Sequence, residues 1–220
     1  MVPRWVKATY YFALSPLMRL NAAFYRATGR GVRHSRRAHL GPGQSNYLPG
    51  WVNVDANLFS ARPDVWADLR ARLPFPDASL DAIYSHHVIE HLPDLDFHFR
   101  DMFRCLRPGG VIRVGGPHGD NAIRALTDGM YDWFGDWPTR RSSLGGRFEN
   151  FVFCKGEHLT ILTESFLREI CQDAGFIDLQ VRRPKESGYP HLFDRDVFEK
   201  EPSALPEMPH TLLIEARKPG

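Results

Sequence analysis

The segment RAHLGPGQSNYLPGWVNVD, residues 37–55, decides the fold. Two short apolar runs, Arg37–Leu40 and Trp51–Val54, have the composition of strands. Gly41-Pro42-Gly43 ends the first run and Asp55 ends the second. Short strands that begin a longer alternation of strands and helices are typical of a parallel sheet.

The rest of the chain continues this alternation of strands and helices. Helical periodicity predicts a helix over Asp94–Leu106, stopped by Pro108-Gly109-Gly110, and another over Thr163–Ala174, capped by Gly175. Further strands are predicted at Val65–Ala67, Asp81–His86, Val111–Gly115, Phe176–Arg182 and Thr211–Ala216. We therefore predict an α/β fold with a mostly parallel, seven-stranded sheet and helices on both faces.

The first 34 residues depart from the alternating pattern and predict a helical arm. Its apolar run, Ala8–Met18, is interrupted by Pro16 and is shorter than the roughly 20 residues that span a bilayer. We therefore expect no integral membrane segment, and we divide the chain into an arm, 1–34, and a second domain, 35–220. The arm is expected to cap the core or to contact a second subunit in a homodimer. Over Trp5–Thr28, large apolar residues recur at the spacing of amphipathic helices: Tyr10, Leu14, Leu17, Leu20 and Phe24.

The overall charge argues against a nucleic-acid partner. The chain has 28 basic and 26 acidic residues, a net charge of +2, which gives no dominant field to attract phosphates. Three widely spaced cysteines, Cys105, Cys154 and Cys171, form no paired metal or redox motif. A reducing cytoplasm suits this cysteine usage.

Ligands of open parallel sheets bind beyond the carboxyl ends of the strands, so the residues after each strand are the candidate site. Gly41 and Gly43 allow the backbone to approach a ligand closely. Asp55, followed by Ala56, comes at the end of the next strand, where its carboxylate could accept both hydroxyls of a ribose. Either motif alone is typical of an ordinary turn, and the pair together favours a nucleoside ligand.

Two more strand ends extend this interpretation. Asp68 can accept from an adenine amino group while Leu69 offers an apolar surface to the ring, although a turn or cap role would also explain Asp68. Ser85, His86 and His87 end the fourth strand and would face the remainder of the ligand. Together the four elements indicate an adenosyl ligand.

These motifs resemble the class I S-adenosylmethionine-dependent methyltransferases of the small type-11 kind, over about residues 37–182. The resemblance implies a Rossmann-like fold and S-adenosyl-L-methionine as cofactor. Pro42 and the absence of a third glycine at Asn46 depart from the common glycine turn. The matching segments are HLGPG (39–43), WVNVD (51–55), ADL (67–69), LPFPDASLDAIYSHHVIEHL (73–92), LRPGGVIRVGGP (106–117) and ESFLREICQDAGF (164–176). The implied cofactor contacts are Gly41, Pro42, Gly43, Asp55, Ala56, Asp68, Leu69, Ser85 and His86.

Methyl transfer to an aliphatic hydroxyl also needs a group that accepts its proton, and histidine suits this role near neutral pH. His118 follows the fifth strand, with Asp120 close enough in sequence to orient it. His86 and His87 compete for the role from the neighbouring strand end. His158 could enter the site from a closing lid.

The segment 118–160 fits the family pattern least and is predicted to form a substrate-side insert or lid. Aromatic rings with polar neighbours suit a sugar, whose C–H groups stack while its hydroxyls are bound, although the same rings could pack the lid or a dimer interface. The resemblance extends to sugar O-methyltransferases of mycobacterial methylmannose polysaccharide biosynthesis, and a small natural-product O- or N-methyltransferase is the alternative. The aromatics are Tyr131, Trp133, Phe134, Trp137, Phe148 and Phe151, among Asp132, Asp136, Arg140, Arg141, Arg147 and Asn150.

Three other classes of function compete. His87-Val88-Ile89-Glu90-His91 spells the inverted zinc-peptidase motif, although Pro93 follows it closely. A nicotinamide enzyme would need glycine at position 46, and a non-catalytic subunit could keep the fold alone. Mg²⁺ could use Asp120, Asp132 and Asp136, but their spacing forms no compact metal loop, so we assign no metal residues.

Overall fold

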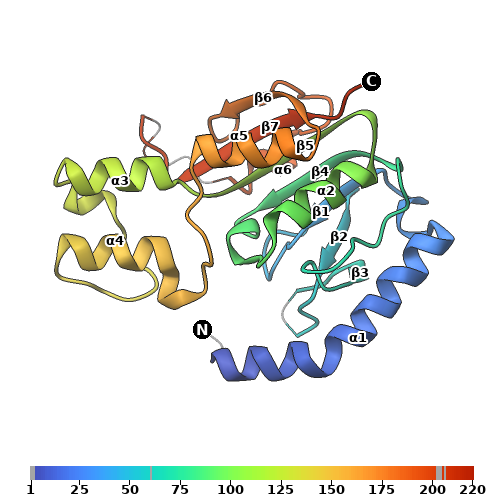
Figure 1. Cartoon of the computed structure of the whole chain (residues 1–220), viewed down its shortest axis with the longest axis horizontal. Helices are drawn as coiled ribbons and strands as arrows, with labels where there is room; N and C mark the ends of the chain where they lie inside the picture. The colour runs from blue at the N-terminus through green and yellow to red at the C-terminus, as the bar shows by residue number, and fades with distance from the viewer. Residues whose placement is uncertain (1–2, 60, 202–204, 206) are drawn as a thin grey trace.

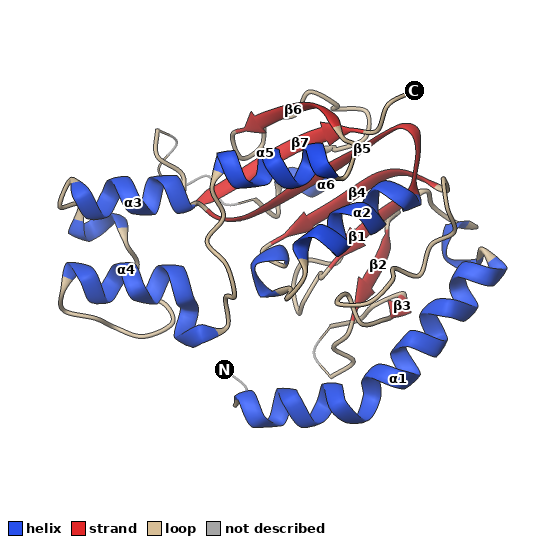
Figure 2. Ribbon diagram, in the orientation of Figure 1, coloured by secondary structure: helices blue, strands red, loops and turns tan. Residues whose placement is uncertain are grey.

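The computed structural model describes residues 3–59, 61–201, 205 and 207–220, and its centre is one seven-stranded sheet (Figures 1 and 2). The strand order is β3-β2-β1-β4-β5-β7-β6, in which β7 is antiparallel to both of its neighbours and the other pairs are parallel. This confirms the predicted α/β fold. The strands are β1 (Arg37–Leu40), β2 (Val52–Asp55), β3 (Val65–Trp66), β4 (Leu80–His86), β5 (Leu106–Pro117), β6 (Ile177–Arg182) and β7 (Thr211–Arg217).

The main hydrophobic core lies between the sheet and two helices, α2 (Leu95–Cys105) and α5 (Glu164–Asp173). Each helix begins where a side chain accepts a hydrogen bond from the first turn: Asp94 caps α2 and Thr163 caps α5. Helix α2 ends at Cys105, and the Pro108-Gly109-Gly110 segment, predicted to stop it, lies inside the longer strand β5.

The opposite face of the sheet is covered by the loop after β1 and by the segment that carries α6 (Arg195–Phe198). Trp51, Tyr84 and Phe193 are buried there. Trp51 stacks on Phe193 with ring centroids 6.0 Å apart. The second face is thus closed mainly by aromatic packing, with one short helix.

The arm is one continuous helix, α1 (Arg4–Thr28), which runs past Pro16, where two or more helices were predicted. It ends at Gly29, whose left-handed conformation (φ 61°) closes the last turn, and η1 (Arg30–Val32) follows. Residues 1 and 2 of the predicted arm lie outside the described part of the chain. None of the described helices is both long enough and apolar enough to cross a bilayer.

The insert contains two helices that the sequence pattern did not predict, α3 (Gly119–Thr127) and α4 (Leu144–Phe153). They lie together beyond the carboxyl ends of the parallel strands (Figure 1). Trp133 and Phe134 are buried between them, so these two rings form the core of the lid, contrary to the sugar-stacking role predicted for them. Short 3₁₀ turns complete this part of the chain: η3 (Tyr131–Trp133) and η4 (Cys154–Gly156).

An ionic network that the sequence did not reveal holds the segment before β7 against the sheet. The Arg113 side chain is fully buried and pairs with Glu201 and Glu215 at 2.7 Å each. Glu215 also accepts hydrogen bonds from Ser187 and from the backbone N–H of Gly188. Buried charges are tolerated only when they are paired in this way.

Substitution Arg113→Met should therefore leave the buried Glu201 without a cation and Glu215 with Arg182 as its remaining cation. We expect the free energy of unfolding to fall by about 3–5 kcal/mol in urea denaturation. Arg124→Met, which removes an exposed ion pair with Asp128, is the matched control and should cost less than about 0.5 kcal/mol. Equal losses in the two variants would contradict a stabilising role for the network.

Candidate functional site

The glycine turn after β1 is the floor of the candidate site. Gly41 has φ +72° and Gly43 has φ +56°, left-handed conformations that favour glycine. The backbone N–H of Gly41 donates to the Val54 carbonyl at 2.8 Å, which fixes the turn to β2. A Cβ atom on Gly41 would lie 2.3 Å from Cγ2 of Val88, so only glycine allows the loop after β4 to pack here.

Substitution of each glycine by alanine should separate the cost of backbone strain from the cost of the steric overlap with Val88. Gly43 has nothing within 4 Å of its Cβ position, so Gly43→Ala should cost only about 1–2 kcal/mol for its left-handed conformation. Gly41→Ala adds the overlap with Val88, and we expect a loss of about 3 kcal/mol or more by chemical denaturation. Similar losses of unfolding free energy in both variants would show that the packing of Val88 does not require glycine at position 41.

Asp55 lies at the end of β2 and holds the turn from the other side. Its Oδ2 atom accepts from the N–H of Gly43 at 3.0 Å, and Oδ1 accepts from the N–H of Asn57 at 2.8 Å. A carboxylate has about four acceptor positions, so the half-buried Asp55 retains capacity for a ligand. The neighbouring Ala56 is buried, and its carbonyl accepts from Tyr10 of α1 and from the Trp66 indole.

Asp68, a predicted adenine contact, is instead surrounded by its own chain. Ser15 of α1 donates to its Oδ2 atom at 2.6 Å, and the Arg70 side chain donates to both oxygens at 2.9 Å. Burial alone would raise the pKa of Asp68, but these hydrogen bonds outweigh it and lower the pKa. Asp68 thus anchors the arm, and Leu69 is buried in the main core.

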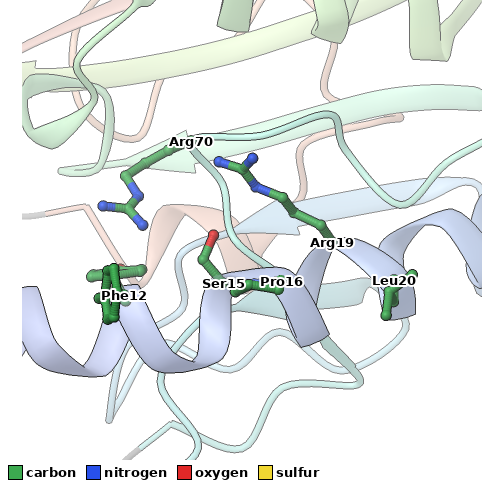
Figure 3. Close-up of a pocket in the computed structure, with 7 residues that line it drawn as sticks. Phe12, Ser15, Pro16, Arg19, Leu20 and Arg70 are labelled. Carbon is green, nitrogen blue, oxygen red and sulfur yellow. The ribbon is translucent and has the colours of Figure 1, made fainter.

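A surface cavity of about 720 Å³ adjoins this anchor between α1 and Arg70. Figure 3 shows Ser15 pointing up from α1, while the side chain of Arg70 runs down toward the same helix on the side of Phe12. The guanidinium of Arg70 also stacks over the Tyr11 ring, 3.6 Å from its centroid. The cavity therefore lies where the arm meets the segment after β3.

Ser85 and His86 end β4 beside the glycine turn. The Ser85 hydroxyl is buried and has no hydrogen-bond partner among the described residues, which leaves it free for a ligand. The His86 ring stacks on Tyr84 with an interplanar angle of 11°. Burial, with a smaller effect of His87, lowers the pKa of His86 to about 2, so His86 stays neutral and is poorly suited to accept a proton.

A second cavity, of about 530 Å³, lies between the carboxyl ends of β4 and β5 and the lid. His87 lines it, with the left-handed φ of +55°. Its Nδ1 atom lies 3.2 Å from Oε1 of Glu90, and its Nε2 atom lies 3.1 Å from the Thr211 hydroxyl. The lining residues are Lys7, His87, Glu90, His91, Pro117, Gly135, Trp137, Asn150, Phe151, Cys154, Glu157, His158 and His210.

His118 and Asp120, the predicted base and its partner, have structural contacts. The Nδ1 atom of His118 accepts from the N–H of Asn121 at 3.4 Å and caps α3. It lies 3.8 Å from Oδ2 of Asp120, which in turn accepts from the N–H of Glu164. The residues lining the second cavity include its neighbour Pro117 but not His118.

Sequence reasoning assigned Glu90 a role only in the zinc-peptidase alternative and assigned none to Thr211 or His210, and all three lie close to the second cavity. Glu90 is 1% exposed, an unusual position for a carboxylate. The one signal for Glu90 was its place between His87 and His91 in the zinc-peptidase motif. The sequence separation of 124 residues between His87 and Thr211 hid the contact between those two residues.

The structure does not support the zinc-peptidase, nicotinamide or Mg²⁺ interpretations. His87 is left-handed, and only a 3₁₀ turn, η2 (Ile89–His91), follows it, so the helix that an inverted zinc-peptidase motif needs is missing from this described segment. Nicotinamide-binding sheets have the order 3-2-1-4-5-6, whereas β7 is inserted here between β5 and β6. For Mg²⁺, Asp136 pairs with Arg147, and the three predicted acids form no cluster among the described residues.

Comparison with known proteins gives a consistent result. Residues 53–114, from β2 to β5, match the methyltransferase domain family. A protein of Mycolicibacterium smegmatis described as a "probable S-adenosylmethionine-dependent methyltransferase" is 46% identical over 57 residues, 26% of this chain and 22% of that protein. The matched region thus spans about a fifth of the length of that relative.

Two solved structures share the fold over nearly the whole chain. An S-adenosylmethionine-dependent methyltransferase of Archaeoglobus fulgidus has a TM-score of 0.55 and 17% identity, covering 95% of this chain and 100% of that one. Another, from Thermotoga maritima, has a TM-score of 0.53 and 16% identity, covering 96% and 95%. The chain therefore carries the sequence pattern of the methyltransferase domain on the fold of S-adenosylmethionine-dependent methyltransferases.

Proposed function

We propose that this protein transfers a methyl group from S-adenosyl-L-methionine to a hydroxyl group of a small molecule held under the lid. One observation carries the proposal: the segment after β4 takes part in both halves of the site. Val88 packs on the Gly41 turn, while the preceding residue, His87, lines the second cavity. A cofactor at the turn and an acceptor in the cavity would therefore meet across two adjacent residues.

The residues at the turn fit the cofactor. Gly43 faces open space, Asp55 has unused acceptor positions for ribose hydroxyls, and the buried Ser85 hydroxyl lacks a partner among the described residues. When bound, S-adenosyl-L-methionine supplies a methyl group activated by its sulfonium. The protein's contribution is to align the acceptor with that group and to exclude water.

Asp55→Asn keeps the size of the side chain and removes its charge. We expect the dissociation constant for S-adenosylhomocysteine, measured by calorimetry, to rise about tenfold to a hundredfold, as for loss of charge-assisted hydrogen bonds. Asp178→Asn is the control, because Asp178 is exposed on β6 and pairs with Arg217. Wild-type protein that fails to bind S-adenosylhomocysteine, or equal affinities in all three proteins, would refute the cofactor site.

The second cavity supports a carbohydrate hydroxyl as acceptor. Trp137 and Phe151 line it beside polar groups; rings of this kind stack against the C–H groups of a sugar. Imidazoles such as His87 and His210 offer hydrogen bonds to hydroxyls. A mannose-type glycan fits this chemistry, with phenolic or amine-bearing natural products as the alternative acceptors.

Within the cavity, His87 is the histidine best placed to accept the proton of an acceptor hydroxyl. Glu90 lies beside Nδ1 of His87, so a hydrogen on Nδ1 would be donated to the Glu90 carboxylate. The lone pair of the ring would then be on Nε2, which lies toward Thr211 and the cavity. His118, by contrast, uses its Nδ1 atom to cap α3. We therefore assign the proton-accepting role to His87.

A panel of mannosides, phenols and amines with methyl-labelled S-adenosyl-L-methionine identifies the acceptor class, and we expect label on a mannoside. With that acceptor, His87→Gln should lower kcat by about a hundredfold to ten-thousandfold, with the affinity for S-adenosylhomocysteine unchanged. His118→Gln should change kcat only a few fold, because it removes a helix cap. The reverse ranking would return the role to His118, and labelling of amines alone would refute the hydroxyl acceptor.

A further inference from the structure

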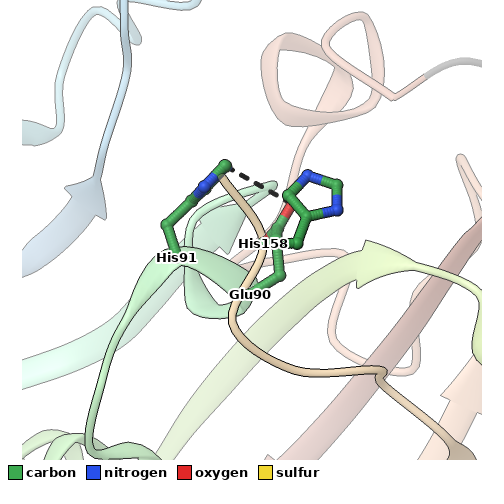
Figure 4. A group of neighbouring side chains, drawn as sticks. All are labelled: Glu90, His91 and His158. Carbon is green, nitrogen blue, oxygen red and sulfur yellow. Dashed lines mark ion pairs between the residues drawn. The ribbon is translucent and has the colours of Figure 1, made fainter. Parts of the chain in front are cut away.

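Three potential metal ligands converge at the edge of the second cavity. Glu90 and His91 come from η2 after β4, and His158 follows η4 in the lid. One ligand atom of each lies within 4.8 Å of the others. Figure 4 shows the three side chains directed toward one another, with Nε2 of His91 3.9 Å from Oε1 of Glu90.

Both histidines are oriented by backbone carbonyls. Nδ1 of His91 lies 2.9 Å from the Glu157 carbonyl, and Nδ1 of His158 lies 2.9 Å from the Val152 carbonyl. A carbonyl oxygen only accepts, so each Nδ1 carries the hydrogen and each neutral ring keeps its lone pair on Nε2. This outer hydrogen bond is the usual support of a metal-binding histidine.

Glu90 adds an independent observation. Its side chain is 1% exposed, His87 occupies Oε1, and the buried Oε2 atom has no hydrogen-bond partner among the described residues. No lysine or arginine of the described chain forms an ion pair with it. Gly116 makes room for the carboxylate, since a Cβ there would lie 3.0 Å from Oε2. His91 lies 3.9 Å from Oε1, so the buried carboxylate adjoins the two histidines and keeps an oxygen that a cation could pair with.

We propose that Glu90, His91 and His158 bind one divalent transition ion of the zinc class. Two imidazole nitrogens and a carboxylate are a common donor set for zinc, and three protein ligands leave a fourth position open. Zinc holds ligands at about 2.1 Å, so two of them can be at most about 4.2 Å apart. Small movements of the partly exposed histidine rings close the present 4.8 Å triangle.

The ion would have two consequences. It would tie the lid, through His158, to the segment after β4, which carries the other two ligands. Its open position would face the second cavity, where it could bind an acceptor oxygen; this part rests on the proposed function. The site differs from the zinc-peptidase motif, because His158 replaces His87 as a ligand and Glu90 is itself a ligand.

Titration of chelator-treated protein with Co²⁺, followed by visible absorption, tests the site, and displacement by Zn²⁺ gives the zinc affinity. We expect one equivalent to bind with the absorption of a tetrahedral ion. His91→Gln and His158→Gln should each weaken binding at least tenfold. His191→Gln is the control, since His191 is exposed in the segment before α6. Zn²⁺ should also slow amide hydrogen exchange over residues 154–158 in wild type but not in His158→Gln.

Two results would overturn the proposal: wild-type protein that takes up no stoichiometric Co²⁺ or Zn²⁺, or His91→Gln and His158→Gln variants that bind as tightly as His191→Gln. Far-UV circular dichroism of the same samples confirms that each variant is folded. S-adenosylhomocysteine calorimetry separates the two proposals, because cofactor binding without metal binding refutes only the metal site. Metal binding without cofactor binding refutes only the proposed function.

Discussion

The contact between Val88 and the bare Cα of Gly41 is the constraint on which the site depends. The chain leaves β1 in a left-handed turn that glycine adopts most readily, and the same absence of a side chain lets the loop after β4 pack onto that turn. Asp55 then fixes the turn through the N–H of Gly43. Three strand ends are thereby locked together at one edge of the sheet, and His87 is presented to the adjoining cavity.

Most of the sheet could be predicted because its signals are local. Short apolar runs predicted six of the seven strands close to their observed bounds, and the caps Asp94 and Thr163 begin the two helices of the main core. Strand β5 proved longer, since tertiary pairing with β7 extends it to Pro117. Gly41, Gly43 and Asp55 lie together as predicted, because carboxyl ends of parallel strands meet at one edge.

The remaining features depend on contacts between distant parts of the chain. Asp68 has the composition of a ligand contact, yet Ser15, 53 positions earlier, occupies it. Trp133 and Phe134 have the composition of a sugar platform, yet they pack the lid. The partners of Arg113 and the approach of His158 to Glu90 carry no periodicity or spacing that a single sequence displays. A glycine turn can be predicted from the residues next to it in the sequence. A buried ionic network joins residues that only the folded chain brings together.

We propose that the strand-end turn binds the adenosyl group while the second cavity receives the acceptor, and a crystal structure of the protein with S-adenosylhomocysteine would decide this. We expect ribose hydroxyls on Asp55, the backbone of Gly41–Gly43 against the ligand, and the sulfur facing the cavity beside His87. An adenosyl group bound elsewhere, for example in the cavity between α1 and Arg70, would contradict it.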